Sequence, residues 1–382
     1  MGVPAAEIER RVGAVQAGLR AAGIDCAVVV EATDLVYLTG VMSDAHLVVP
    51  AEGDPVLLVR RGLERVQAES PIGDVRPLTS LKALAALLAE HGAKRVGFEL
   101  DVLPAARYLR YRDLLADAEI VDVADVLAGI RAVKSTWEIE MSRKAAEQLA
   151  AAFAAAPALV AEQPTDLAIQ IELERILRHA GHQGALRFRG LNGQMFYGAV
   201  LAGPDGAVAP WSDTPLGGPG QNAATAKGPG GWAIRDGDAV TVDLVGGHEG
   251  YLADATRTFF RGEPNPLLVE ALDVCERVLA DIEGLMTPGT PWQDLYLRGL
   301  EIATEAGFGD NWMGHGPSRV RFVGHGVGLE INERPFLAQG FEAPLEEGHV
   351  IAVEPKLVFP GVGAVGVENT YAVGPAGPSR IT

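Results

Sequence analysis

The sequence is poor in cysteine, in basic residues and in long apolar runs. Only Cys26 and Cys275 occur among 382 residues, which excludes a disulfide framework and indicates a reduced, cytoplasmic protein. Lysine and arginine total 32 against 50 aspartates and glutamates, and the resulting net charge of −18 disfavours nucleic-acid binding. No run of about 18 apolar residues occurs, so we expect no membrane span. The N-terminal segment also lacks the basic-then-apolar order of a signal peptide.

What remains is an ordinary globular composition, with 48% hydrophobic and 21% charged residues, at a length that suits two domains. In residues 1–130, apolar runs typical of strands alternate with helical patterns near residues 5–22 and 80–91. The runs HLVVP and PVLLVRR, separated by AEGD, predict a hairpin. We therefore expect a small α/β domain there, followed by a larger α+β domain over residues 131–382.

The second region repeats one arrangement, in which helices precede a strand hairpin. Ser135 can cap the first of its helices. The Gly- and Pro-rich stretch 203–232 is too long for an ordinary connection and indicates a functional or mobile loop. The sequence predicts helices near 136–157 and 165–180, strands within 186–262, helices within 264–307 and strands within 320–373.

An acidic hairpin is expected in VTVDLVGGHEGYLADATRTF. A turn near Gly247 and His248 would place Asp243 directly opposite Asp254 on one face of the hairpin. A lone aspartate near a turn is structural or solvated in roughly nine cases of ten. Asp243, however, interrupts an apolar strand, and two facing carboxylates repel each other unless a cation lies between them.

A second acidic hairpin is expected in VIAVEPKLVFPGVGAVGVENTY, where Glu354 and Glu368 lie symmetrically about Gly361. Both interrupt apolar runs. Between the two hairpins, His325 stands between glycines in FVGHGVGLE, and a flanking glycine allows a ligand to approach closely. Taken alone, this histidine is a ligand with a prior of roughly one in five, given its many other roles.

Together these segments supply four carboxylates and one imidazole. That donor set suits two divalent ions, with Mn²⁺ or Co²⁺ favoured and Zn²⁺ or Fe²⁺ possible. Neither cysteine lies near these segments, which excludes a cysteine-rich zinc site. Two ions that share carboxylates lower the pKa of a bridging water and polarise a carbonyl. The expected reaction is attack of hydroxide on an amide or related bond.

In order and spacing, the three segments resemble those of the pita-bread metallopeptidases prolidase, aminopeptidase P and methionine aminopeptidase, to which the metal-free creatinase is related. The segment IRAVKSTWEIEMSRKAA also looks like the start of their catalytic domain. The resemblance covers nearly the whole chain. It implies a creatinase-like N-terminal domain over residues 1–130, a pita-bread catalytic domain over residues 131–382, and a homodimer.

The resemblance also implies a role for each ligand. Asp243 would chelate one metal, and His325 and Glu354 would bind the other. Asp254 and Glu368 would bridge the two ions, and Glu354 would serve as the general base. All five positions carry a residue able to ligate, which disfavours a metal-free, creatinase-type site.

The sequence departs from the family where the relatives bind peptide. Lys227 stands near the position of a first pocket histidine, and Asn332, followed by Glu333, replaces a second one. Gly366 replaces an arginine two residues before the last glutamate. We expect Asn332 and Glu333 to contact substrate, but the Xaa-Pro specificity of the relatives does not transfer with the metal ligands.

Four further residues are candidates, each with an ordinary alternative. His315 is a possible proton shuttle or an exposed loop histidine. Lys227 could bind a substrate carboxylate, or simply be exposed as most lysines are. Tyr197 and Trp211 lie in segments leading to the pocket, where aromatic residues pack more often than they recognise a ligand.

Three functions remain open on the sequence alone. The first is a metal-dependent amidase or peptidase of the Xaa-Pro dipeptidase type, acting on a small molecule or short peptide. The second is a related enzyme of non-peptide chemistry, since the family includes an ectoine hydrolase and a lyase of a sulfonium zwitterion. The third is a non-catalytic binding protein, which the complete set of buried acidic ligands disfavours.

Overall fold

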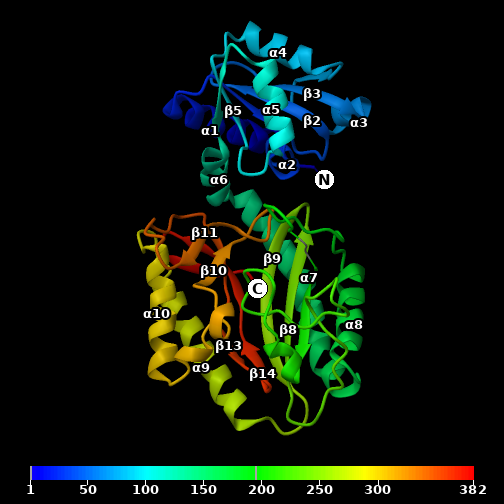
Figure 1. Ribbon diagram of the computed structural model, residues 1–382, viewed down its shortest axis with the longest axis vertical. Coiled ribbons are helices and arrows are strands. Elements are labelled where there is room, and N and C mark those ends of the chain that lie inside the picture. The colour runs from blue at the N-terminus through cyan, green and yellow to red at the C-terminus, as the bar shows by residue number, and fades with distance from the viewer. Residues whose placement is uncertain (1, 194–195) are drawn as a thin grey trace. The chain divides into compact units, whose positions relative to one another are not determined.

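The computed structural model describes residues 2–193 and 196–382, and the chain divides into two compact units (Figure 1). The first unit comprises Met1–Arg131 and Arg189–Gly193, and the second comprises Ala132–Phe188 and Gln194–Thr382. Helices and strands mix in both units, which confirms the predicted α/β class. The predicted domains, 1–130 and 131–382, stay a proposal about which parts fold independently.

A six-stranded sheet forms the centre of the first unit, in the order β4-β3-β2-β1-β5-β6. The predicted hairpin is confirmed, because the two strands on either side of AEGD pair antiparallel. Strand β1 pairs antiparallel with β2 and parallel with β5, so the sheet is mixed. The strands are β1 (Cys26–Val29), β2 (Asp44–Pro50), β3 (Val56–Arg61), β4 (Asp74–Pro77), β5 (Arg95–Phe98) and β6 (Glu119–Asp122).

Helix α1 (Ala5–Ala22) confirms the first predicted helix and ends where Gly23 adopts a left-handed conformation with φ 63°. Apolar residues of two further helices join buried strand residues in one core, among them Val28, Leu84 and Phe98. The helices after α1 are α2 (Ala32–Thr39), α3 (Leu63–Glu69), α4 (Leu81–Glu90), α5 (Ala105–Leu114) and α6 (Ala124–Ala132).

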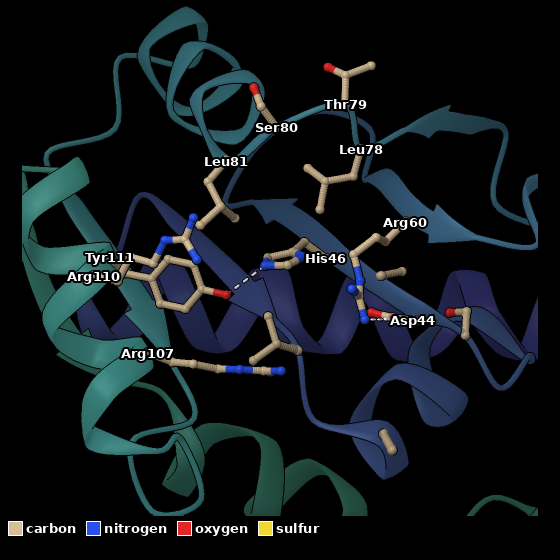
Figure 2. Close-up of a pocket in the computed structure, with 14 residues that line it drawn as sticks. Asp44, His46, Arg60, Leu78, Thr79, Ser80, Leu81, Arg107, Arg110 and Tyr111 are labelled. Carbon is tan, nitrogen blue, oxygen red and sulfur yellow. Dashed lines mark hydrogen bonds and ion pairs between the residues drawn. The ribbon is translucent and has the colours of Figure 1, made fainter.

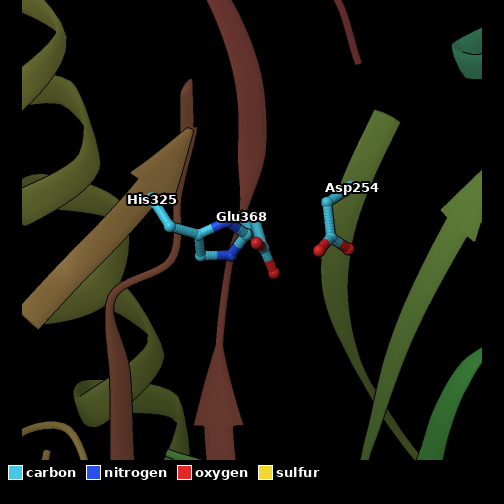
Figure 3. A group of neighbouring side chains, drawn as sticks. All are labelled: Asp254, His325 and Glu368. Carbon is cyan, nitrogen blue, oxygen red and sulfur yellow. The ribbon is translucent and has the colours of Figure 1, made fainter. Parts of the chain in front are cut away.

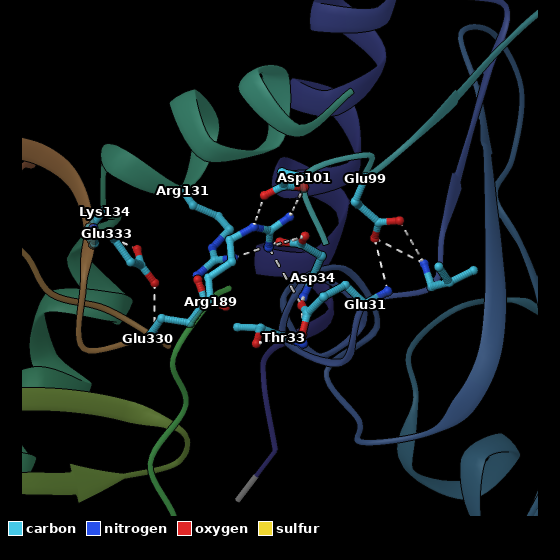
Figure 4. A network of polar contacts seen from close by, with 11 residues as sticks. Glu31, Thr33, Asp34, Glu99, Asp101, Arg131, Lys134, Arg189, Glu330 and Glu333 are labelled. Carbon is cyan, nitrogen blue, oxygen red and sulfur yellow. Dashed lines mark hydrogen bonds and ion pairs between the residues drawn. The ribbon is translucent and has the colours of Figure 1, made fainter. Parts of the chain in front are cut away.

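The first unit also includes a short segment from far along the chain, Arg189–Gly193. The Arg189 guanidinium donates to Asp34 Oδ2 at 2.9 Å and to Asp101 Oδ1 at 3.0 Å, and Arg131 donates to Asp34 Oδ1 at 2.8 Å (Figure 4). Two arginines therefore share the buried Asp34 carboxylate. Such charge-assisted pairs hold the segment to the unit more firmly than exposed ion pairs would.

Glu99 lies beside this network and should make the stability of the protein pH-dependent. Its side chain is fully buried, and its Oε1 accepts from the backbone N–H groups of Val30 at 3.0 Å and Glu31 at 3.1 Å. Burial, and then the neighbouring Asp34 carboxylate, raise the pKa of Glu99 to about 8. The folded protein thus binds a proton that the unfolded chain releases near pH 4.5.

We therefore expect the free energy of unfolding to fall as the pH rises towards 8, by on the order of 1 kcal/mol per pH unit. Denaturant unfolding between pH 6.5 and pH 8 measures this, and because histidines of the unfolded chain still lose protons near pH 6.5, the slope is taken as a difference from a variant that lacks the carboxylate. The Glu99→Gln variant keeps the acceptor oxygen and serves as the control. An equal pH dependence in the variant and the wild type would contradict the assignment.

A pocket of about 480 Å³ opens in the first unit (Figure 2). His46 and Tyr111 meet there, with Nε2 and Oη 2.6 Å apart, and Arg107 and Arg110 also line the wall. Burial, and then the charge of Arg107, lower the pKa of His46 to about 4. His46 is therefore neutral at physiological pH, and the positive charge of the pocket comes from its arginines.

The second unit places strands between two pairs of helices, with α7 and α8 on one flank and α9 and α10 on the other (Figure 1). The predicted repetition of helices followed by strands is confirmed. The helices are α7 (Thr136–Glu162), α8 (Asp166–His179), α9 (Pro266–Leu285) and α10 (Trp292–Glu305), with short 3₁₀ turns at Gly203–Ala207, Gly309–Asn311 and Gly316–Ser318.

In the described part of this unit the strands form three sheets, in the orders β7-β8-β9, β11-β10-β12-β15-β16 and β13-β14. The first is formed by β7 (Gly198–Ala202), β8 (Ala239–His248) and β9 (Tyr251–Phe260). The others contain β10 (Phe322–Gly326), β11 (Glu333–Ala338), β12 (Val350–Val353), β13 (Lys356–Phe359), β14 (Gly363–Gly366), β15 (Asn369–Gly374) and β16 (Gly377–Arg380).

Helix α7 begins as predicted but is longer than predicted. Ser135 caps it, and the reciprocal bond from Ser135 N to Glu138 completes a capping box. The expected end near Pro157 is wrong, because the helix continues to Glu162. Its alanine-rich sequence favours helix, and residues on both sides of the proline, Ala156 and Val160, are buried in the core.

Among the described residues, no helix has the length and apolar character needed to cross a membrane.

Candidate metal centre

The first acidic hairpin forms, but its register differs from the predicted one. Asp243 lies opposite Thr256, and Asp254 lies opposite Val245, so the two aspartates are diagonal neighbours rather than direct partners. They still share a face, because the offset is two residues. The turn consists of Glu249 and Gly250, both at positive φ (49° and 88°), as a two-residue hairpin turn requires.

The misplaced turn has a physical cause in the packing of α7. Gly246 and Gly247 indicate a turn by composition, yet both are paired within the hairpin. A Cβ atom on Gly246 would lie 2.1 Å from the carbonyl oxygen of Ala145 in α7. Glycine is therefore needed here for close approach of the helix backbone rather than for chain reversal.

The second acidic hairpin has the predicted register. Val353 pairs with Asn369 and Lys356 with Gly366, so Glu354 and Glu368 lie opposite each other between these pairs, symmetrically about Gly361. Pro355 lacks an N–H group, which accounts for the interruption between β12 and β13. Both glutamates sit at this interruption, where the strands pass from one sheet to the other.

Asp254, His325 and Glu368 form a group in which one donor atom of each lies within 4.8 Å of the others (Figure 3). The three come from β9, β10 and the segment between β14 and β15. Asp254 Oδ1 and Glu368 Oε1 are buried and have no hydrogen-bond partner among the residues that the structure describes. Unpartnered buried carboxylate oxygens beside an imidazole are the donors that a divalent cation takes up, so the residues fit a metal ion.

His325 is oriented for ligation by its second ring nitrogen. Its Nδ1 lies 3.2 Å from the carbonyl oxygen of Gly326, a distance that suits donation of the Nδ1 proton. The unprotonated Nε2 then faces the acidic group and lies 3.6 Å from Glu354 Oε1. A histidine that binds metal is commonly fixed in this way by a backbone carbonyl.

Lys356 is a central residue of the site that sequence reasoning missed. Its side chain is fully buried, and its Nζ donates to Glu368 Oε2 at 3.0 Å and to Glu354 Oε2 at a shorter distance. Asp243 Oδ2 lies 3.7 Å away. Burial alone would lower the pKa of Lys356, but these three carboxylates outweigh it and raise that pKa well above the usual value. The ammonium group is therefore charged.

Burial and mutual repulsion strain the acidic group electrostatically. Burial is the main cause that raises the pKa of both Asp243 and Asp254, and the nearby Glu368 carboxylate raises each further. The effect is stronger at Asp254, for which Asp243 and Glu354 add to it. Buried carboxylates crowded in this way favour any cation that approaches them.

Thr256 and Arg257 hold Glu368 in place, a role that the sequence analysis did not predict for either residue. Thr256 Oγ1 donates to Glu368 Oε2 at 2.6 Å, and Arg257 donates to the backbone carbonyl of Glu368 at 2.6 Å. The available signal was the alternation in ADATRTF, which puts Thr256 on the same face as Asp254.

Lys227 is brought towards the acidic group by the long loop. The loop folds back on itself through hydrogen bonds from Gly220 N to Gly228 O (2.9 Å) and from Gly228 N to Gly217 O (2.8 Å). Burial lowers the pKa of Lys227, and attraction by Asp243 and then Glu354 opposes that effect. Lys227 is therefore close enough to interact with the centre.

The other predicted substrate and proton-transfer residues are not brought to the acidic group by any contact of the described residues. His315, Asn332 and Trp211 are exposed. Tyr197 is half-buried, and its hydroxyl donates to the carbonyl of Gly184 at 3.0 Å. Their proposed roles stay predictions, and the course of these loops could not be read from local sequence.

Glu333 is buried within the protein. Its Oε2 accepts from Lys134 Nζ at 3.2 Å, and its Oε1 accepts from the backbone N–H of Glu330 at 2.9 Å (Figure 4). A carboxylate engaged in this way positions the segment between β10 and β11. A direct role of Glu333 in substrate binding stays a prediction.

Comparison with known proteins gives two family matches. Residues 140–375 match the model of metallopeptidase family M24, and residues 11–133 match the creatinase/prolidase N-terminal domain. The chain is 28% identical to the uncharacterized peptidase YqhT of Bacillus subtilis, over 94% of each chain. It is 26% identical to an Xaa-Pro dipeptidase of Lactobacillus delbrueckii subsp. lactis, covering 93% of this chain and 92% of the relative.

A solved structure is similar over the whole length. The dipeptidase PepE from Mycobacterium ulcerans superposes with a TM-score of 0.83 at 25% identity, covering 100% of this chain and 97% of that one. The similarity covers the residues of both compact units, in agreement with the two family matches.

Proposed function

Because this chain belongs to metallopeptidase family M24, we propose that it hydrolyses an amide or peptide bond of a small substrate with the help of a divalent ion. The pita-bread catalytic domain and the creatinase-like N-terminal domain predicted from the sequence are confirmed by the family matches and by the similar structure. Membership of this family makes the chain a metal-dependent hydrolase.

The observation that carries this proposal is the group of Asp254, His325 and Glu368, with its two unpartnered carboxylate oxygens. A divalent ion there would polarise a scissile carbonyl and lower the pKa of an attacking water. The sequence predicts two ions, Mn²⁺ or Co²⁺ before Zn²⁺ or Fe²⁺. For those two ions the sequence predicts the ligands Asp243, Asp254, His325, Glu354 and Glu368.

Glu354 is proposed as the general base. Its Oε2 is engaged by Lys356, while its Oε1 faces the imidazole of His325. One oxygen of Glu354 is thus left towards the proposed metal, where it can accept the proton of an attacking water. Lys227 is proposed to donate to the substrate or its leaving group, since its charge already interacts with the centre. His315 is the alternative proton donor.

The substrate is proposed to be a short peptide, because relatives along the whole chain carry the name Xaa-Pro dipeptidase. We expect turnover of simple Xaa-Pro dipeptides to be slow, with kcat/KM below about 10⁴ M⁻¹s⁻¹. Asn332 cannot shuttle a proton near neutral pH, and Gly366 has no side chain. General acid–base help is typically worth about 10²- to 10⁴-fold.

Steady-state kinetics on a panel of Xaa-Pro and other dipeptides, with Mn²⁺, Co²⁺ and Zn²⁺ in turn, test both statements. Metal-dependent turnover that a chelator abolishes would support hydrolysis at this centre. Absence of turnover on every dipeptide and amide with every metal would overturn peptide hydrolysis. A kcat/KM of about 10⁴ M⁻¹s⁻¹ or more on Xaa-Pro would show that the missing pocket histidines are dispensable.

The second candidate is hydrolysis or elimination on a small non-peptide molecule, of the kind an ectoine hydrolase or a related lyase carries out. Lys356 favours this second candidate. Its buried ammonium group pairs with Glu354 and Glu368 and makes the centre less negative towards a bound substrate than the carboxylates alone would. A homodimer and a cytoplasmic location are further proposals, which sedimentation analysis and cell fractionation would test.

A further inference from the structure

Lys356 divides the carboxylate oxygens of the centre into two sets. Its ammonium group takes the Oε2 atoms of Glu354 and Glu368 and lies 3.7 Å from Asp243 Oδ2. The oxygens that Lys356 does not engage include Glu354 Oε1, near His325, and the unpartnered Glu368 Oε1 and Asp254 Oδ1. The Asp243 side of the centre therefore already contains a cation, and the His325 side does not.

The fold makes specific room for this lysine. Lys356 and Glu354 are two residues apart on an extended segment, so their side chains point to the same side. Across the hairpin, Lys356 pairs with Gly366, and a Cβ atom at Gly366 would lie 2.5 Å from Lys356 Cγ. Any larger residue at 366 would displace the lysine stem. The pair Lys356–Gly366 thus works as one unit.

The balance of charge in the centre also favours one divalent ion over two. Two divalent ions would by themselves neutralise the four carboxylates of Asp243, Asp254, Glu354 and Glu368. Adding the buried Lys356 ammonium, with Lys227 close by, would leave an excess of positive charge in a buried site. One divalent ion together with the Lys356 ammonium group leaves no excess of positive charge over the four carboxylates, and uncompensated buried charge is costly.

We infer that the ammonium group of Lys356 stands in place of the second metal ion, so that this chain binds a single divalent ion at Asp254, His325 and Glu368. Glu354 Oε1 is the fourth donor available to that ion. Asp243 then pairs with ammonium groups and does not ligate metal. The inference rests on the proposed function only in that both require a divalent ion at this centre.

Metal content after saturation with Mn²⁺ and removal of loosely bound ions tests the inference in the full-length protein. We expect one ion per chain in the wild type and two in Lys356→Ala, which frees the Asp243 side. Electron paramagnetic resonance should change accordingly, from the spectrum of isolated Mn²⁺ to that of an exchange-coupled pair. Lys134→Ala is the matched control, because it also removes a buried lysine from an ion pair, and it should keep one ion.

Two ions in the wild type, or a single ion in a folded Lys356→Ala variant, would overturn the inference, as would a second ion in Lys134→Ala. If Lys356→Ala does not fold, the metal content of Asp243→Asn tests the inference instead. It should retain its one ion, and loss of that ion would contradict the inference. Two coupled ions with metal-dependent turnover would overturn this inference alone, whereas one ion without turnover on any substrate would overturn only the proposed function.

Discussion

Replacing Asp254 with asparagine will remove the bound divalent ion and lower turnover by at least roughly 10²- to 10³-fold. Asparagine keeps the shape of the side chain but loses the negative charge that the ion requires. The fold should survive, because Thr370 contacts only the backbone of Asp254, accepting from its N–H at 2.9 Å and donating to its carbonyl at 2.8 Å. Metal analysis and turnover of the best dipeptide substrate measure the two effects.

Asp166→Asn is the matched control for this prediction. Asp166 is also buried in the second unit and has an unpartnered carboxylate oxygen, and burial raises its pKa to about 6. Its neutralisation should leave the bound ion in place. Retention of a tightly bound ion in Asp254→Asn, or equal loss in both variants, would show that Asp254 is not a specific ligand.

Glu354→Gln should lower kcat by about 10²- to 10⁴-fold, the range typical of a lost general base. Glutamine keeps the size of the side chain and an oxygen that can accept from Lys356, but it cannot take a proton from water near neutral pH. The bound ion should remain, because Asp254, His325 and Glu368 are unchanged and the glutamine amide still offers an oxygen to the ion.

Separate values of kcat and KM, with metal content measured on the same sample, test this role. Substrate binding is expected to change little, so the loss should fall on kcat. The exposed Glu342→Gln provides a control for charge removal at the surface. A variant that keeps wild-type kcat with its ion bound would exclude Glu354 as the base.

Much of the acidic centre is predictable from local sequence because strands alternate with a period of two. Carboxylates that interrupt apolar strands need partners, and symmetry about Gly361 was enough to pair Glu354 with Glu368. The first hairpin was less accessible. Its glycines are required by a helix about a hundred residues earlier in the chain, and only the three-dimensional packing against Ala145 reveals this.

Lys356 was missed although the sequence contains the signal. It lies in the apolar run VEPKLVF, two residues after Glu354 and therefore on the same face of the strand. The register predicted for this hairpin pairs it with Gly366. The absence of a side chain at 366 and the presence of a buried lysine across the hairpin are therefore one feature. The positions of His315 and Trp211 follow from long loops, whose course depends on distant contacts that local patterns do not encode.

Crystals of the Mn²⁺-loaded protein, measured at the manganese absorption edge, would show where this chain holds its divalent ion. An anomalous difference map locates the ion without reference to activity. We expect a single peak in the second unit, bounded by Asp254, His325 and Glu368, with the ammonium group of Lys356 beside Glu368 and no ion on Asp243. A fully loaded crystal with no peak among these three side chains would contradict it.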